Sequence, residues 1–144
     1  MRALDVNCHY LPADFLQRAE AAGARPPFMM RRAAAIPTMA GRAARARLLD
    51  DFPGYRQIPC LSSPPLEEWT TPEQAASLAR AANDGLAELC AAEPDRYPAF
   101  VATIPLLAPD AAAAEIERAR KLGAVGVQFF TNVAGLPLDD PSFA

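Results

Sequence analysis

The strongest constraint on the fold of this chain is an alternation of short apolar segments with longer helical ones. Apolar runs at residues 2–7, 55–62, 100–106 and 125–130 have the length of strands and are bounded by proline, glycine or polar residues. Between these runs lie segments whose apolar residues recur with helical spacing. Strands that alternate with helices indicate parallel β-α-β units, so we expect an α/β fold with about four such units.

The helix predicted after the second strand has the clearest boundaries. Thr71 is suited to the N-cap, Pro72 to the first helical position, and Gln74 completes a capping box. The pair Glu93-Pro94 is expected to end this helix. Its apolar residues are spaced three or four apart and predict one buried face, made of Ala75, Leu78, Ala79, Ala82, Leu86, Leu89 and Cys90.

Two shorter helices are predicted at residues 14–22 and 110–122, each followed by a glycine. A further helix is expected in the Ala- and Arg-rich segment 28–51, which Pro37 and Gly41 interrupt. The apolar side of this further helix, expected to face a core, consists of Ala44, Leu48 and Leu49. Its arginines Arg42, Arg45 and Arg47 could bind a substrate carboxylate through a bidentate guanidinium, or they could form a solvated helix face.

Polar residues alternate along the first strand. In a regular strand Asp5, Asn7 and His9 project on one side, and Val6 and Cys8 on the other. His9 is the only histidine of the chain, and one imidazole cannot hold a catalytic zinc, which normally takes three protein ligands. From the residues alone, His9 is therefore either a structural polar group or one member of a larger ligand set.

The neighbours of His9 also leave alternatives open. Asp5 could lie behind the ligands of a site and hold them in the correct orientation, or it could cap the end of the strand. Cys8 could pack in the core or form a nucleophilic Cys–His pair. Cys60 and Cys90 are expected to be core cysteines because they lie in apolar segments.

Composition excludes several classes of protein. The 144 residues suffice for one domain with a core, and the net charge of −3 gives no argument for a nucleic-acid or membrane partner. Three cysteines without a CxxC spacing indicate neither a disulfide framework nor a structural zinc site. No segment approaches the ~18 apolar residues of a membrane span. A cytoplasmic location is the expectation.

Residues 5–12, Asp-Val-Asn-Cys-His-Tyr-Leu-Pro, resemble the first-strand signature of the amidohydrolase superfamily. Their Tyr-Leu-Pro end is similar to the branch of aminocarboxymuconate-semialdehyde decarboxylase and related metal-dependent decarboxylases. The resemblance continues in order through residues 48–57, 82–86, 94–97, 117–128 and 131–133. It therefore covers nearly the whole chain.

This resemblance implies a TIM (β/α)8 barrel of the metal-dependent hydrolase type, of which only the N-terminal half is present. Residues 1–144 would be the N-terminal part of a single amidohydrolase-related domain, truncated at the C-terminus, because a complete barrel typically needs ~250 residues. In this family two first-strand histidines bind a divalent metal, usually zinc. His9 matches the second ligand, whereas Asn7 stands at the position of the first. The remaining ligands would lie beyond residue 144.

The implied function is that of a fragment of a metal-dependent carboxy-lyase (decarboxylase) or hydrolase. The substrate would be a small carboxylated aromatic-derived or unsaturated acid, and the family also allows for a homodimer of the whole protein. Asn7 favours the alternative of a metal-free pseudoenzyme or binding protein. We expect the chain by itself to be inactive and to associate through the open edges of its first and fourth strands.

Substrate-side residues are predicted from topology, because the loops after barrel strands build active sites. Trp69, Ser62 and Ser63 follow the second strand, and Asn132 follows the fourth. With Arg47 as a carboxylate partner, we expect Arg47, Trp69 and Asn132 to contact the substrate.

Overall fold

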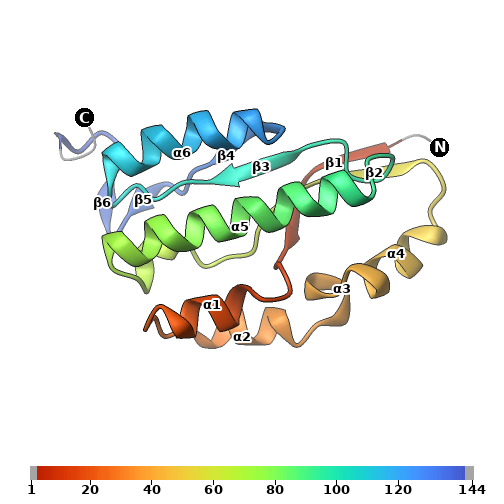
Figure 1. The fold of residues 1–144 in the computed structure, drawn as a ribbon, viewed down its shortest axis with the longest axis horizontal. Helices are drawn as coiled ribbons and strands as arrows, with labels where there is room; N and C mark the ends of the chain where they lie inside the picture. Colours follow the sequence, from red (N-terminus) through yellow and green to blue (C-terminus); the bar gives the residue numbers. More distant parts are fainter. Residues whose placement is uncertain (1–2, 142–144) are drawn as a thin grey trace.

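The computed structural model describes residues 3–141, in which strands and helices alternate as the sequence predicts (Figure 1). The elements that carry the alternation are β1 (Ala3–Tyr10), β2 (Tyr55–Leu61), α5 (Pro72–Ala92), β3 (Phe100–Thr103), α6 (Pro109–Lys121) and β4 (Ala124–Gln128). The additional elements are α1 (Phe15–Ala21), α2 (Phe28–Ala34), α3 (Pro37–Ala40), α4 (Arg42–Asp50), the 3-10 turn η1 (Leu66–Glu68) and the hairpin strands β5 (Asn132–Val133) and β6 (Leu136–Pro137).

The four long strands run parallel in two hydrogen-bonded pairs. β1 pairs with β2, and β3 pairs with β4. The two pairs are neighbours, since the Gln57 backbone N–H of β2 donates to the Arg96 carbonyl oxygen (2.8 Å), just before β3. β1 and β4 are therefore the outer strands. They carry the exposed apolar side chains of Leu4, Val6 and Val125. This exposure is a physical reason to expect association through these edges, which stays a prediction.

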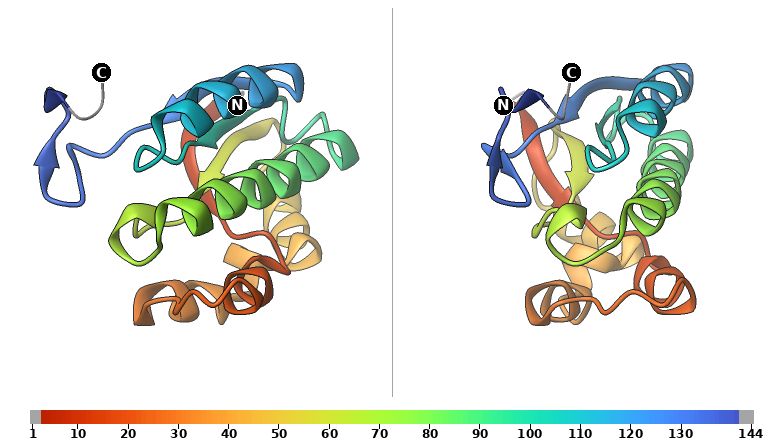
Figure 2. Two further views of the ribbon diagram at one scale, coloured as in Figure 1. Left: turned by 60° about the vertical axis from the view of Figure 1, so that its left-hand side comes forward. Right: turned by 90° about the vertical axis from the view of Figure 1, so that its left-hand side faces the viewer.

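Helices α5 and α6 cover one face of the strands (Figure 2). The predicted capping box is confirmed: the Thr71 hydroxyl accepts from the Gln74 N–H, and the Gln74 side chain accepts from the Thr71 N–H. The predicted apolar face of α5 is also confirmed, with Cys90 only half-buried.

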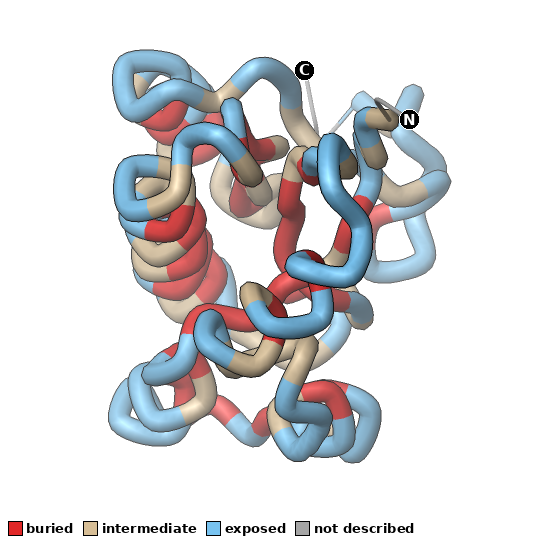
Figure 3. Tube along the Cα trace, turned by 90° about the vertical axis from the view of Figure 1, so that its right-hand side faces the viewer, coloured by how far each residue is buried: buried red, intermediate tan, exposed pale blue. Residues whose placement is uncertain are grey.

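The N-terminal and C-terminal halves of α5 pack into two different clusters, and the buried positions concentrate where helices and strands meet (Figure 3). The first cluster joins α1, α2 and the end of β2 to α5: Leu11, Phe15, Ala19, Met30, Leu61, Leu66, Leu78 and Ala82. The second cluster joins β1, α4, β3 and α6 to α5: Tyr10, Leu49, Leu86, Leu89, Tyr97, Phe100, Ala102 and Ala119.

The buried side of α4 differs from the predicted one. Leu49 is buried as expected, but Leu48 is 47% exposed, and Arg45 is buried at 7% exposure. Arg45 can be buried because its guanidinium donates hydrogen bonds to acceptors inside the protein, whereas the Leu48 side chain points toward solvent. Within residues 3–141 no helix is long and apolar enough to cross a membrane.

Candidate functional site

The carboxyl ends of β1 and β2 lie side by side and bring His9 next to Cys60. These two residues are direct partners in the parallel register, so their side chains project from the same face of the sheet. The adjacent residue Tyr10 belongs to the buried cluster under α5. His9 and Cys60 therefore project away from α5, toward the side that is the interior in a closed barrel.

A register shift in β1 separates Asp5 from His9. Asp5 pairs with Gln57 and His9 pairs with Cys60, so the β1 residues are four apart while their β2 partners are only three apart. Positions three apart in a strand face opposite sides, and the extra residue of β1 is accommodated between Asp5 and Cys8. The prediction that Asp5 lies on the same face as His9 is wrong for this reason.

Asp5 stabilises this irregular segment of β1. Its carboxylate accepts a hydrogen bond from the Asn7 backbone N–H (3.1 Å) through Oδ1 and from the Tyr55 hydroxyl (2.9 Å) through Oδ2. The first bond satisfies an N–H within the shifted segment, and the second ties β1 to the start of β2. These contacts support a local structural role for Asp5, although it lies within β1 and not at the end of the strand, where a cap was expected.

Cys60 contacts both predicted metal-binding residues. Its Sγ lies 3.2 Å from Asn7 Oδ1 and 3.4 Å from His9 Nδ1, and the Cys8 carbonyl oxygen is more distant at 3.6 Å. Cys60 is fully buried, His9 is half-buried and Asn7 is exposed. Burial, reinforced by the nearby Asp5 charge, raises the pKa of the Cys60 thiol to about 11, so this thiol is protonated at neutral pH.

Cys8 is not positioned to form a nucleophilic pair with His9. It is partnered with Pro59, next to Cys60 in β2, and its side chain is buried on the opposite face from that of His9. Burial raises the pKa of the Cys8 thiol to about 12, which also disfavours a thiolate. Sequence reasoning assigned Cys60 only to the core. Its place beside His9 could have been found only from the register of β1 against β2.

Arg45 fixes the backbone of the site from the helix side. Its Nη1 donates to the carbonyl oxygens of His9 (2.8 Å) and Thr38 (3.1 Å), and its Nε donates to Gln57 Oε1 (2.9 Å). The guanidinium also lies 5.7 Å from the centre of the Tyr10 ring. Arg45 thus holds the end of β1 in place, a role that the sequence pattern did not reveal.

The predicted substrate-side residues lie in three separate places. Arg47 is exposed on α4. Trp69 is half-buried after η1 and packs against the cluster that contains Phe15. Asn132 is exposed in the β5–β6 hairpin, where its Oδ1 accepts from the Gly135 N–H (3.1 Å). Within residues 3–141 the side-chain hydrogen bonds of His9 do not involve any of these three residues, so their substrate role stays a prediction.

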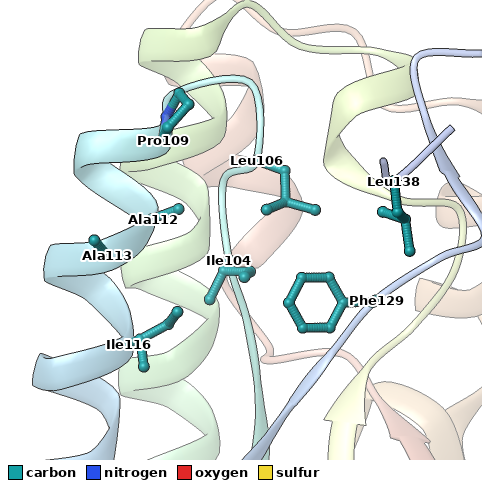
Figure 4. A pocket seen from close by; sticks show the side chains of 8 residues that line it. All are labelled: Ile104, Leu106, Pro109, Ala112, Ala113, Ile116, Phe129 and Leu138. Carbon is teal, nitrogen blue, oxygen red and sulfur yellow. The ribbon is translucent and has the colours of Figure 1, made fainter. Parts of the chain in front are cut away.

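An apolar pocket of about 480 Å³ lies away from His9, between α6, the end of β3 and the segment around the hairpin (Figure 4). Phe129 and Leu138 face Ile104 and Leu106 across it (Figure 4). All eight side chains that line this pocket are apolar. It offers no group for acid, base or metal chemistry, and the candidate site remains at His9.

The profile of the amidohydrolase family matches residues 5–144. The chain belongs to this family. The match includes His9, Asn7 and Cys60 and agrees with the placement of polar side chains at the carboxyl ends of the strands.

Named relatives of this amidohydrolase chain are decarboxylases. It is 43% identical over 83 residues to the gamma-resorcylate decarboxylase of Rhodococcus jostii (strain RHA1), an alignment that covers 57% of this chain and 25% of that protein. Its fold matches a crystal structure of 2,6-dihydroxybenzoate decarboxylase complexed with 2,6-dihydroxybenzoate, with a TM-score of 0.71 and 29% identity. That match covers 99% of this chain and 45% of the other.

A dihydroxybenzoic acid decarboxylase from Polaromonas sp. JS666, crystallised with manganese and the inhibitor 2-nitroresorcinol, matches with a TM-score of 0.66 and 28% identity. This match covers 88% of the amidohydrolase chain and 38% of that enzyme. The chain thus spans less than half the length of the relatives it matches. The predicted fold class is confirmed: its four strands and their helices form part of a (β/α)8 barrel.

The donors at the end of β1 fit part of a metal site. Within residues 3–141 no group of three or more His, Cys, Asp and Glu side chains is arranged to hold a metal. The His9 imidazole and the Asn7 amide oxygen nevertheless supply one nitrogen and one oxygen donor on the side of the sheet away from α5. Imidazole suits cations such as zinc and iron, and a carbonyl oxygen suits manganese, so the two donors together are compatible with a first-row divalent cation. A complete site therefore requires further ligands besides these two.

Proposed function

We propose that this chain is part of a metal-dependent decarboxylase of small aromatic carboxylic acids and that β1 supplies two of its metal ligands. The observation that carries the proposal is the position of His9, at the carboxyl end of β1 and on the face opposite to α5. Active-site residues of (β/α)8 enzymes come from these strand ends. The relatives that share the fold and part of the sequence are decarboxylases of dihydroxybenzoic acids.

His9 would donate a ring-nitrogen lone pair to the cation, and Asn7 would donate its side-chain carbonyl oxygen. A bound divalent cation would polarise oxygen atoms of the substrate and stabilise the negative charge that develops when carbon dioxide leaves. Manganese, present in the Polaromonas enzyme, is the first cation to test, and zinc is the second. Asn7 is neutral, so we expect weaker binding than a carboxylate or a second imidazole would give.

The substrate class follows from the decarboxylases that this chain resembles. A carboxylated phenol such as 2,6-dihydroxybenzoate supplies the carboxyl group that is lost and neighbouring oxygens that can reach a cation. Trp69 and Asn132 follow β2 and β4, where barrel loops build active sites, and this topological position is what supports their proposed contacts with the substrate. Arg47 is proposed as a guanidinium partner for the substrate carboxylate. These relatives favour decarboxylation over lactone or amide hydrolysis.

Metal binding to the chain itself is the first test. Mn²⁺ is paramagnetic and broadens the NMR signals of nearby nuclei, and the chain has a single histidine, so the His9 ring signals report on one site. We expect Mn²⁺ to broaden these signals at lower concentrations than the signals of exposed carboxylates such as Glu88. An Asn7→Ala variant should need more Mn²⁺ for the same broadening, whereas the control variant Gln17→Ala, which removes an exposed amide on α1, should behave like the wild type.

Decarboxylation is the second test, made on a protein in which residues 1–144 are part of a complete barrel. We expect Mn²⁺-dependent release of carbon dioxide from 2,6-dihydroxybenzoate, lost in a His9→Ala variant. Absence of release with both manganese and zinc, or release that persists in His9→Ala, would contradict the proposal.

Asn7 is the one residue that favours a metal-free binding protein instead. That alternative predicts no selective effect of Mn²⁺ on His9 in the wild type and a clear effect in an Asn7→His variant. Selective broadening in the wild type would argue against it.

A further inference from the structure

Three polar groups converge where β1 and β2 end side by side: the thiol of Cys60, the amide of Asn7 and the imidazole of His9. Cys60 Sγ lies within 3.4 Å of both Asn7 Oδ1 and His9 Nδ1, and each of these distances is within the range of a sulfur hydrogen bond. Cys60 is fully buried. The contacts follow directly from the register in which His9 pairs with Cys60.

The hydrogen atoms can be assigned from the chemistry of the three groups. A thiol has one hydrogen to donate, and its shortest contact with an oxygen acceptor is the 3.2 Å contact with Asn7 Oδ1. The Cys8 carbonyl oxygen, at 3.6 Å, is the longer alternative. With its hydrogen directed at Asn7, the sulfur faces His9 Nδ1 with lone pairs, and His9 must therefore be the donor in that contact.

We propose that Cys60 is a positioning residue that holds neutral His9 with its proton on Nδ1 and orients the Asn7 carbonyl. The unprotonated Nε2 of His9 and the second lone pair of Asn7 Oδ1 are then both directed away from Cys60. This role rests on the proposed function in one respect: the divalent cation is the group to which His9 and Asn7 donate these lone pairs.

The arrangement matches a general requirement of metal sites. A histidine that binds a metal through one ring nitrogen usually donates the hydrogen of the other nitrogen to an outer acceptor, which fixes both the tautomer and the ring orientation. Carboxylates and carbonyl oxygens are the common acceptors. Within residues 3–141 the contact of His9 Nδ1 is with the Cys60 sulfur, because Asp5 is turned to the other face by the register shift in β1.

The test uses ¹⁵N NMR of the histidine ring in the metal-free chain. Long-range ¹H–¹⁵N correlation distinguishes a protonated ring nitrogen from an unprotonated one, and the single histidine removes any ambiguity of assignment. At about pH 8.5, where an ordinary imidazole is neutral, we expect wild-type His9 to carry its proton on Nδ1. Cys60→Ala should shift His9 toward a mixture of both tautomers.

Two variants control for structural damage. Cys60→Ser should keep the wild-type tautomer, because a hydroxyl can also donate to Asn7 and accept from His9. Cys90→Ala removes a different cysteine, half-buried on α5, and should leave His9 unchanged. Wild-type His9 protonated on Nε2, or an unchanged tautomer in a folded Cys60→Ala variant, would overturn the proposal. If Cys60→Ala does not fold, loss of the Nδ1–H tautomer in Cys60→Ser would overturn it instead.

Metal affinity provides an independent second measurement. Loss of an outer partner typically lowers metal affinity 10–100-fold, so Mn²⁺ binding at His9 should weaken by about that factor in Cys60→Ala. Equal Mn²⁺ affinity in the wild type and Cys60→Ala would count against the positioning role. Failure of the wild type to bind Mn²⁺ would contradict the proposed function, while the tautomer measurement would still decide the role of Cys60.

Discussion

Replacing Asn83 by leucine should destabilise the chain strongly, because Asn83 connects α5 to the end of β3. Its side chain is fully buried and forms two hydrogen bonds with the backbone of Thr103, as a neighbouring strand would. Nδ2 donates to the Thr103 carbonyl oxygen (2.9 Å), and Oδ1 accepts from the Thr103 N–H (3.0 Å). Nδ2 also donates to Glu115 Oε1 (2.7 Å). Glu115 is itself buried and paired with Arg118.

The magnitude follows from the groups that Asn83→Leu leaves without a partner. These are the N–H and the carbonyl oxygen of Thr103 and one contact of a buried carboxylate, Glu115. Each unsatisfied buried group costs about 1–3 kcal/mol. Leucine has the same branched side-chain skeleton as asparagine but bulkier terminal groups, so it leaves little room for water. Partial relaxation reduces the sum, so we expect a loss of about 4 kcal/mol in the free energy of unfolding.

This loss is measured by urea denaturation, with unfolding monitored both by the fluorescence of Trp69, the only tryptophan, and by circular dichroism. The matched control Ser77→Leu places the same side chain on the exposed side of α5 and should change the free energy of unfolding by less than about 0.5 kcal/mol. A loss below about 1 kcal/mol in Asn83→Leu, with the two probes coincident, would refute the reasoning.

Three further substitutions test a close packing contact, a helix cap and a buried hydrogen bond by the same denaturation assay. Gly85→Ala would raise helix propensity, but its added Cβ would lie 2.6 Å from Pro12 Cβ, so we expect a net destabilisation of about 1–3 kcal/mol; a stabilised variant would contradict the predicted clash. Thr71→Ala removes the capping box and should cost about 1 kcal/mol, and an unchanged midpoint would mean that the cap contributes nothing. Arg45→Met keeps the apolar stem but removes the donor to the His9 carbonyl oxygen, and we expect a loss of about 3 kcal/mol; a neutral result would show that this carbonyl finds another partner.

Local chemistry accounts for the parts of the fold that could be predicted. The boundaries and the buried face of α5 depend on residues within one helix, such as Thr71 and Gln74 at its start, and the structure shows them as expected. The same holds for the end of α6 at Gly123, whose φ of +102° suits glycine. Four strands alternating with helices likewise require only local patterns, which is why the α/β architecture could be predicted, whereas the half-barrel was implied by the family resemblance.

The site could be predicted only in part, because its contacts depend on the register between distant strands. The position of His9 at the end of β1 follows from the sequence. Its contact with Cys60, 51 residues away, does not. One extra residue in β1 reverses the faces of the side chains before and after it, and no local pattern marked that irregularity.

The sequence by itself therefore determined the α/β architecture, the helix ends and the place of the sole histidine at a strand end, since propensities, caps and apolar periodicity act over a few residues. Only the tertiary structure decided that Asp5 hydrogen-bonds to the backbone of β1, that Arg45 rather than Leu48 is buried, and that Cys60 lies against His9. The physical reason is that these three outcomes are set by inter-strand register and by which buried donors find acceptors across the fold.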